Sequence, residues 1–444
     1  LLSRTTAPRP LAMQTRHPIR LPEKTQTNGS RWAGTMLKLF LISTARLPGL
    51  IWRALLQSPD DRAPPTWRRR AMLVLFIPLF LCVQGLHWLG FLLDELLFRR
   101  YRDVEVRAPL FVLGVPRSGT TNLHQILAKD RQFTTFSSWE CLFALSVSER
   151  LFWRALGRLD ARLGGWIARL IDRIERRAFA TLDDIHAMGL KTPEEDYFAL
   201  MPVLSCFILA LPFPGSAHLW RMGRFDRDMP ADEAALILDF YHRCLQKHLY
   251  VHGPEKRLLS KNAAFAPLAL GLATRFPDAS FLICLRDPLD TLPSQLSSIA
   301  PGLRLFGVPD DSPVIRDRFI DQLAFYYDNL ERLARIHPHR CHRASLAAIK
   351  SRLTEVVTEA YARFDLPLST AFRQQLEAET TGARAYRSGH RYSLAQFGLS
   401  EEEIKARFAD ARAQLSQLLS AESARHRETA PLHPNQPQGE GATC

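Results

Sequence analysis

The sequence predicts an α/β fold: a parallel sheet of about four to five strands flanked by helices, with an N-terminal hydrophobic helical extension. Residues 257–260 and 280–285 are short strand-like runs, and the stretch between them, 266–276, has helical character. Two strands joined by a helix form a β-α-β unit, in which the strands are parallel. A third apolar run, 110–113, leads through a loop of small residues into another helix. We expect these three runs to share one sheet.

Composition and charge limit the classes of function. With 46% hydrophobic and 23% charged residues, the 444-residue chain has the composition of a globular protein with a sizeable core. The net charge of +13 suits anionic ligands, but the arginines are scattered through amphipathic helices and the sequence carries no nucleic-acid motif, so nucleic acid is not an expected partner. Seven widely spaced cysteines without a CxxC pair argue against a disulfide framework and a zinc site, and favour a reducing compartment.

The chain divides into four regions by composition and periodicity. The first residues show no periodicity, and a more structured run opens at Met36; the last residues are polar and rich in proline. The predicted regions are 1–35, a disordered tail; 36–105, a basic and hydrophobic helical region that could associate with a membrane; 106–425, the α/β domain, with a helical insertion at about 140–250; and 426–444, a second disordered tail.

Residues 71–93 carry no charge and are flanked by arginines at 68–70 and 99–100. This length is sufficient for a transmembrane helix, but a segment in the membrane interface and a soluble helical cap are alternatives. Pro78 and Gly85 weaken a straight span, and arginines on both flanks give little orientation preference. We expect an interfacial hairpin, broken near these two residues, that attaches the protein to the cytoplasmic face of a membrane.

The segment 109–130 is expected to bind an anion. Its loop, PRSGTT at 116–121, lies between a strand and a helix, so backbone N–H groups and the helix dipole converge there. The spacing of Gly114 and Gly119 matches the GxxxxG of a nucleotide P-loop, which makes the sheet P-loop-like, but the next residue is Thr120 and not lysine. A nucleotide kinase or NTPase with a degenerate P-loop is therefore an alternative that this residue disfavours. The expected ligand-binding residues of the loop are Arg117, Ser118, Gly119, Thr120 and Thr121.

Two further cations follow predicted strands. Arg286 follows the run 280–285, and Ser294 lies eight residues later in the next helix, so the two side chains can hold one phosphate from two directions. Lys261 follows the run 257–260. Ligands of open parallel sheets gather at the carboxyl ends of the strands, so we expect these side chains near the loop.

These motifs resemble those of sulfotransferases that use 3′-phosphoadenosine 5′-phosphosulfate (PAPS). The loop 116–121 is similar to their 5′-phosphosulfate loop, and the spacing of Arg286 and Ser294 is similar to that of their 3′-phosphate site. The segments 192–196 and 389–399 resemble segments of the bacterial "sulfotransferase 3" type, and the resemblance covers about 94–399. It implies PAPS as co-substrate, no metal, and a hydroxyl or amine acceptor that is small or lipid-like.

The resemblance also implies roles for single residues. Lys261 is expected to contact the bridging oxygen and the transferring sulfonate, although Asn262-Ala263 follows it where the family often has Ser-Pro. Arg387 lies in a late basic loop that could close over the nucleotide. A non-catalytic, membrane-associated member of the fold is an alternative, which the presence of Lys261, Arg286 and Ser294 disfavours.

The sequence leaves the catalytic base open. Glu140 is one candidate, because some sulfotransferases carry a catalytic glutamate past the loop helix, and Trp139 could desolvate it and raise its pKa. His124 on the loop helix is a second candidate, and His186 a third. Glu194 and Glu195 are further candidates, although with Asp196 they also fit an acidic first helical turn. The acceptor and the oligomeric state have no signal in the sequence.

Overall fold

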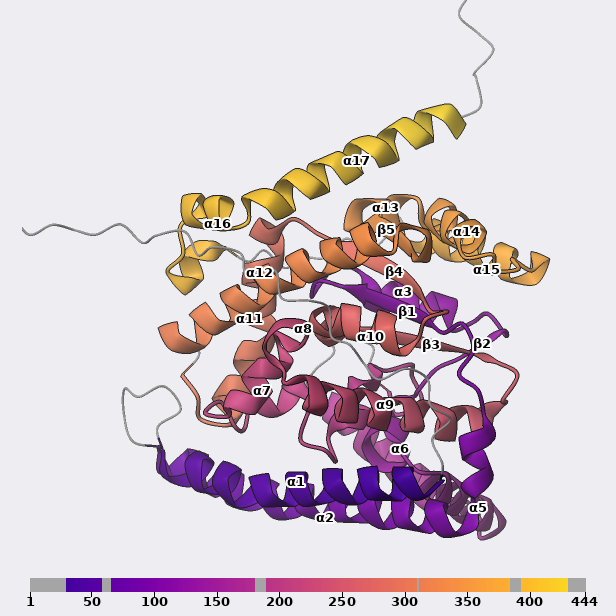
Figure 1. Ribbon diagram of the computed structural model, residues 1–444, viewed down its shortest axis with the longest axis vertical. Coiled ribbons are helices and arrows are strands. Elements are labelled where there is room, and N and C mark those ends of the chain that lie inside the picture. The colour runs from indigo at the N-terminus through magenta and orange to yellow at the C-terminus, as the bar shows by residue number, and fades with distance from the viewer. Residues whose placement is uncertain (1–28, 58–64, 180–188, 310, 384–392, 430–444) are drawn as a thin grey trace, which may run out of the picture.

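The computed structural model describes residues 29–57, 65–179, 189–309, 311–383 and 393–429 (Figure 1). At its centre is a five-stranded parallel sheet with the strand order β2-β3-β1-β4-β5. This confirms the predicted fold class; the two-residue strand β2 was not predicted. The strands are β1 (Leu110–Gly114), β2 (Phe133–Thr134), β3 (Arg257–Asn262), β4 (Ser280–Leu285) and β5 (Cys341–Ser345).

Helices cover both faces of the sheet, so alternate residues of one strand enter different cores. Phe111 and Leu113 of β1 belong to the larger core, which is shared with α9, α10 and α12. Leu110 and Val112 belong to the smaller core, shared with α3, α13, α14 and α15. The helices around the sheet are α3 (Thr120–Leu127), α9 (Ala231–His252), α10 (Ala269–Arg275), α11 (Pro288–Leu305), α12 (Pro313–Ile336), α13 (Leu346–Ser351), α14 (Leu353–Arg363) and α15 (Thr370–Ala383).

The remaining helices lie in the N-terminal region, the predicted insertion and the C-terminal region. In Figure 1 the first two lie side by side along one end of the molecule, and α17 lies along the opposite end. They are α1 (Gly29–Leu56), α2 (Trp67–Leu97), α4 (Ser138–Phe143), α5 (Val147–Arg162), α6 (Trp166–Phe179), α7 (Ala217–Met222), α8 (Phe225–Asp228), α16 (Glu401–Arg407) and α17 (Ala409–Thr429). Helix α1 begins at Gly29, inside the predicted tail 1–35, and helix α17 ends at Thr429, inside the predicted tail 426–444. Both predicted tails therefore include several residues that are helical.

Helix α2 is one unbroken helix, so the predicted hairpin with a break near Pro78 and Gly85 is wrong. Its buried positions recur every three or four residues, from Arg69 to Asp94, and form one continuous stripe against the domain. Pro78 lies on the exposed side of the helix. Packing along the stripe therefore holds the helix together across the one position that lacks a backbone N–H.

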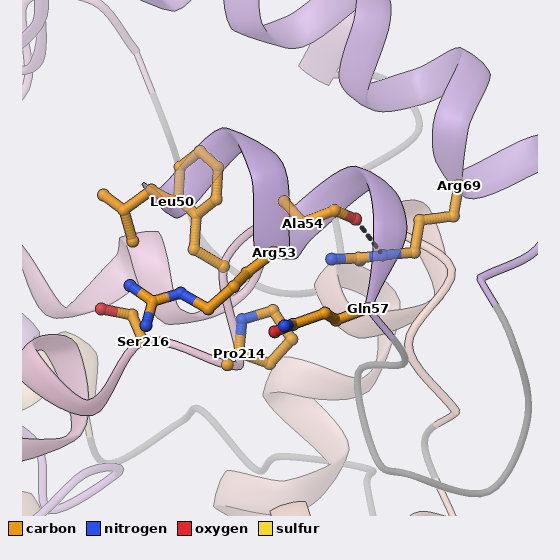
Figure 2. A pocket seen from close by; sticks show the side chains of 9 residues that line it. Leu50, Arg53, Ala54, Gln57, Arg69, Pro214 and Ser216 are labelled. Atoms are coloured by element: carbon orange, nitrogen blue, oxygen red, sulfur yellow. Dashed lines mark hydrogen bonds between the residues drawn. The ribbon is translucent and has the colours of Figure 1, made fainter. Parts of the chain in front are cut away.

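Buried polar groups fasten α1 and α2 to the rest of the protein. The Arg69 guanidinium donates hydrogen bonds to three carbonyl oxygens, those of Ala54 (3.2 Å), Pro212 (3.0 Å) and Phe306 (2.6 Å). Figure 2 shows Arg69 reaching the carbonyl of Ala54 beside a small pocket between the end of α1 and the turn around Pro214. Burial lowers the pKa of Arg69 to about 10. One side chain thus joins α2 to α1 and to two other segments of the chain.

Candidate active site

The loop after β1 has an unusual backbone conformation. Arg117 has a φ angle of +63° and Gly119 one of +88°. This left-handed conformation costs a residue with a side chain about 1–2 kcal/mol. A Cβ atom at Gly119 would lie only 2.9 Å from Leu346 Cδ1, so glycine is also needed for space. The buried Ser118 hydroxyl donates to the carbonyl of Val115 at 2.6 Å and holds the loop closed.

The loop delivers a helix N-terminus to the end of the sheet. Helix α3 begins at Thr120, as predicted, and its N-cap residue, Gly119, has no side chain to cap it. The N–H groups of the first turn are therefore left for a ligand, and the helix dipole favours an anion there. On the strand side, a Cβ at Gly114 would lie 2.5 Å from the carbonyl oxygen of Cys284 in β4. The close approach of β1 and β4 thus requires a glycine at the start of the loop.

Arg286 follows β4 directly and contacts the loop. Its Nη1 donates to the carbonyl oxygen of Arg117 at 3.3 Å. The Tyr327 hydroxyl of α12 donates to the carbonyl of Arg286 at 2.6 Å and fixes its backbone. The Nε of Arg286 is buried and has no hydrogen-bond partner among the described residues. A carboxylate oxygen of Asp290 lies 3.8 Å from it. Ser294 is buried on α11, the helix that follows Arg286.

Lys261 brings a second cation to the start of α3 from the neighbouring strand β3. Its Nζ donates to Thr121 Oγ1 at 3.1 Å and to Glu195 Oε1 at 2.7 Å. The lysine side chain is 4% exposed and the glutamate side chain 23%, so only the carboxylate is partly open to solvent. The residue of the loop that corresponds to the P-loop lysine is Thr120. The ammonium group of this site therefore comes from β3 and not from the loop.

A buried carboxylate holds the segment that carries Glu195. Asp196 accepts hydrogen bonds from Tyr241 (2.5 Å), from Ser260 (2.8 Å) and from the side-chain amide of Asn262. The last two donors lie in β3 on either side of Lys261. Burial raises the pKa of Asp196 to about 6, although these hydrogen bonds oppose the shift. The network fixes Glu195 to the strand that supplies Lys261.

His124 lies one turn into α3 and is fully buried. Its Nε2 lies 2.7 Å from Thr135 Oγ1, and its Nδ1 has no partner among the described residues. Burial, and then the positive charge of Lys261, hold the pKa of His124 well below its usual range. The ring is therefore neutral at physiological pH and can exchange hydrogen bonds without carrying charge.

Glu140 lies in a different cluster. Its carboxylate accepts a hydrogen bond from His252 Nε2 (2.6 Å), lies 3.2 Å from Arg150 Nε, and closes the capping box of α4 with Ser137. Burial alone would raise the pKa of Glu140, but the His252 hydrogen bond and the Arg150 charge outweigh it and hold the pKa well below its usual range. The expected rise is therefore wrong, because the carboxylate meets the Arg150 charge and the His252 hydrogen bond and not only Trp139. Glu195, and not Glu140, is the carboxylate that contacts Lys261.

The same cluster has the donor set of a metal site. Ligand atoms of Glu140, His248 and His252 lie within 4.8 Å of one another. Arg150, however, is fully buried against this carboxylate and stacks on Phe136 at 5.3 Å. The guanidinium already supplies the positive charge that a cation would bring, so a metal ion does not fit this set of residues.

The structure brings most predicted site residues to one place. The loop residues 117–121 are contacted by Lys261 from β3 and by Arg286 from β4. His186 and Arg387 lie outside the residues that the structure describes. The pairing of Glu195 with Lys261 and the anchoring role of Asp196 were not predicted. The run Glu194-Glu195-Asp196 was the visible signal, but it also suited an acidic helical turn, and a short 3-10 helix does begin at Asp196.

Comparisons with known proteins agree with the fold. Residues 109–370 match the model of the sulfotransferase family. Sulfotransferase STF1 from Mycobacterium tuberculosis H37Rv is 20% identical with a TM-score of 0.61, covering 85% of this chain and 98% of its own. Sulfotransferase STF9 from Mycobacterium avium is 18% identical with a TM-score of 0.61, covering 84% and 94%. At these low sequence identities, the similarity to the two structures shows only that the fold is shared. No curated protein matches the sequence.

Proposed function

The chain belongs to the sulfotransferase family and is a transferase, and from this premise we propose that it moves a sulfuryl group from PAPS to a hydroxyl or amine of a small or lipid-like acceptor. The observation that carries the proposal is the position of Lys261 Nζ between Thr121 of the anion-binding loop and Glu195. A cation, an anion-binding helix terminus and a carboxylate thus meet at one point.

The residues around the loop fit the phosphate groups of PAPS. The uncapped N-terminus of α3 offers N–H donors, and Thr120 and Thr121 offer hydroxyl groups. The unpaired, buried Nε of Arg286 is a donor that an anion would satisfy. Ser294, on the helix after Arg286, is proposed to bind the same phosphate. Arg117 and the backbone of Ser118 and Gly119 complete the proposed set, to which Arg387 is added from the sequence alone.

Lys261 is proposed to stabilise charge during transfer. PAPS, when bound, would supply the sulfuryl group, and as the bond from sulfur to the 5′-phosphate oxygen breaks, that oxygen would gain negative charge on the leaving 3′-phosphoadenosine 5′-phosphate. The shielded ammonium group of Lys261 donates to Thr121 at the start of α3, which supports this role. In a site of low water content such a contact is worth more than in solution. No residue in this proposal needs a metal ion.

Glu195 is proposed as the base that takes the proton from the acceptor. Its carboxylate is partly exposed, whereas Lys261 behind it is not. The carboxylate of Glu195 accepts the hydrogen bond from Lys261, and the Asp196 network holds the segment in position. Neutral His124 is a second candidate, because its Nδ1 is unpaired. That Glu140 is the base stays a prediction from the sequence. Its contacts with His252, Arg150 and Ser137 favour a structural role.

The test is a transfer assay with 35S-labelled PAPS and extracts of soluble metabolites and of lipids. We expect labelled products with the wild-type protein, and about 100- to 1,000-fold slower formation of them with Lys261→Ala. The assay is repeated with ATP and magnesium, labelled in the γ-phosphate. Phosphate transfer in place of sulfuryl transfer would contradict the proposal and favour the P-loop kinase alternative.

We further propose that the enzyme works in the cytoplasm and is associated with a membrane through 71–93. Two described helices, Gly34–Leu56 and Trp67–Leu97, have the length and hydropathy of membrane spans, and most of each lies unburied. Fractionation and protease treatment of inverted vesicles test the location. The catalytic domain should be found with membranes and should be digested from the cytoplasmic side.

A further inference from the structure

Between 71 and 93, the polar residues of helix α2 lie on its buried side among apolar ones, and its outer side is wholly apolar. Arg69, Gln84, His87 and Asp94 are buried against the domain. Between 71 and 93 every exposed side chain is apolar, which is the reverse of a helix on the surface of a soluble protein. The large exposed side chains of this outer face are Val74, Leu75, Leu79, Leu86, Leu89 and Leu92.

The buried polar groups of α2 keep it in the domain. Asp94 pairs with Lys247 of α9 at 2.7 Å, and both side chains are at most 1% exposed. His87 Nδ1 lies 2.7 Å from Glu149 Oε1 of α5. A helix that left the domain to cross a bilayer would strand these charges without partners, which is strongly unfavourable. The outer face can therefore meet lipid only if α2 lies along the membrane surface.

A second apolar face lies on α5 and α6. Helix α5 packs against α2, and α6 packs against α5. Both helices expose large apolar side chains over most of their length, although the sequence pattern also fits a solvated helix pair. Those of α6 include Trp166, Leu170, Ile171 and Ile174, and those of α5 include Leu151, Phe152 and Leu159.

Arginines accompany this second face. Residues 147–179 contain eight arginines and four acidic residues. Arg150 is buried against Glu140, and Asp160 is buried as the cap of the Ile167 and Ala168 N–H groups, so seven arginines and three acids remain outside these contacts. Arg169, Arg173 and Arg176 of α6 are exposed. A helix with one apolar face and an arginine-rich remainder is typical of helices that lie in the interface of a bilayer.

We infer that α6 is a second lipid-binding element, and that with α1 and α2 it places the protein flat on an anionic bilayer. This extends the membrane association proposed above from one segment to a surface, and it does not depend on the transfer reaction. Anionic head groups complement the arginines, whereas two copies of this face would set like charges against each other. On α1 an open apolar hollow of about 600 Å³, lined by residues such as Leu47, Ile51 and Trp52, offers room for acyl chains.

Vesicle sedimentation of the full-length protein tests the inference. Wild type is compared with the double variant L170E/I174E, using phosphatidylcholine vesicles and vesicles of equal parts phosphatidylcholine and phosphatidylglycerol. Ile336→Glu is the matched control, because Ile336 is an equally exposed apolar residue on α12. We expect the double variant to bind the anionic vesicles about tenfold more weakly, the control to bind like wild type, and wild type to prefer the anionic vesicles.

Each other outcome overturns the inference. If L170E/I174E binds like wild type, α6 does not contact lipid and α2 acts alone. If wild type binds no vesicles but self-associates in light scattering, and the double variant does not, the face pairs two copies of the chain. Since residues 170 and 174 are exposed, the folded state of the variant is checked by its binding of 3′-phosphoadenosine 5′-phosphate, which also shows whether the proposed donor site is intact.

Discussion

Lys261 Nζ donates a hydrogen bond to Glu195 Oε1 at 2.7 Å, and it reaches Thr121 Oγ1 of the loop helix at 3.1 Å. The lysine thus connects two proposed functional groups. One is the carboxylate of Glu195, the proposed base, and the other is the N-terminus of α3, which is proposed to bind the donor. A charge that is shielded from water and held by two partners is already oriented before substrate binds. The following predictions depend on this arrangement and on the groups that support it.

Lys261→Ala should lower kcat by about 100- to 1,000-fold and change KM little, because the charge that Lys261 meets develops during transfer. Steady-state kinetics with PAPS measures both constants. Lys261→Arg is the control: it keeps the charge but not the geometry, so a partial loss is expected. An effect on KM alone would remove Lys261 from the chemical step.

Glu195→Gln should lower kcat by about 100-fold or more while the affinity for the donor product stays the same. Glu194→Gln is the matched control, because the neighbouring carboxylate accepts hydrogen bonds from Ser138 Oγ and from the N–H of Glu195 and does not contact Lys261 in the structure. If Glu194→Gln loses as much activity, the segment 194–195 acts through its position and not through proton transfer.

Arg286→Ala should weaken binding of 3′-phosphoadenosine 5′-phosphate by about 1.5–3 kcal/mol, the value of a hydrogen bond to a charged group. Isothermal titration calorimetry gives the affinity, and AMP, which lacks the 3′-phosphate, is titrated in parallel. Wild type should prefer the bisphosphate, and the variant should lose that preference. Arg335→Ala, an exposed arginine near the end of α12, should behave like wild type. Equal affinity of wild type for both nucleotides would contradict a two-phosphate site.

The sequence predicted the parts of the site that lie at strand ends, because strand and loop signals are local. Arg117 and Arg286 belong to short motifs, and parallel pairing of β1 with β4 brings them together. The Lys261–Glu195 pair could not be predicted, since the residues are 66 positions apart and the segment before Glu195 is irregular. In α2 both sides are apolar, so only the tertiary partners of Arg69 and Asp94 distinguish the packed side from the open one.

Asp196 should give the protein a pH-dependent stability. Burial raises its pKa to about 6 in the folded state, whereas an unfolded chain has a value near 3.8. Between these values the folded state binds the proton more tightly, so this group stabilises the fold below about pH 4 and loses that contribution as pH rises through about 6. The total is about 3 kcal/mol, at 1.36 kcal/mol for each pKa unit.

Asp196→Asn cannot titrate, so the difference in Tm between wild type and this variant should shift in favour of wild type as pH falls from 7 to 5. Thermal unfolding at several pH values measures it. Glu140 titrates with the opposite sign, because its pKa is lowered, but it is present in both proteins and cancels in the difference. A difference in Tm that does not change with pH would show that Asp196 is ionised or protonated throughout this range.

The depth of α2 in a bilayer should be the same along its outer face. Nitroxide labels are attached at three positions: at the native Cys82, and at new cysteines in Leu75→Cys and Leu92→Cys. All three proteins carry Cys444→Ser, and the two proteins with a new cysteine also carry Cys82→Ser. All three positions are exposed on the open side of the helix, and the other described cysteines are buried. Oxygen and a water-soluble nickel chelate then report the depth of each label.

A helix lying in the interface buries its apolar face about 5–10 Å, so we expect one shallow depth for all three labels. In a spanning helix, position 75 would lie about 10 Å and position 92 about 15 Å along the axis from Cys82, because each residue adds about 1.5 Å. Cys82 would then be deepest, near the bilayer centre, and the polar contacts of Asp94 and His87 would have to break. A gradient of that kind would therefore refute the flat arrangement, while a label at Ile336→Cys should remain accessible to the nickel chelate in either case.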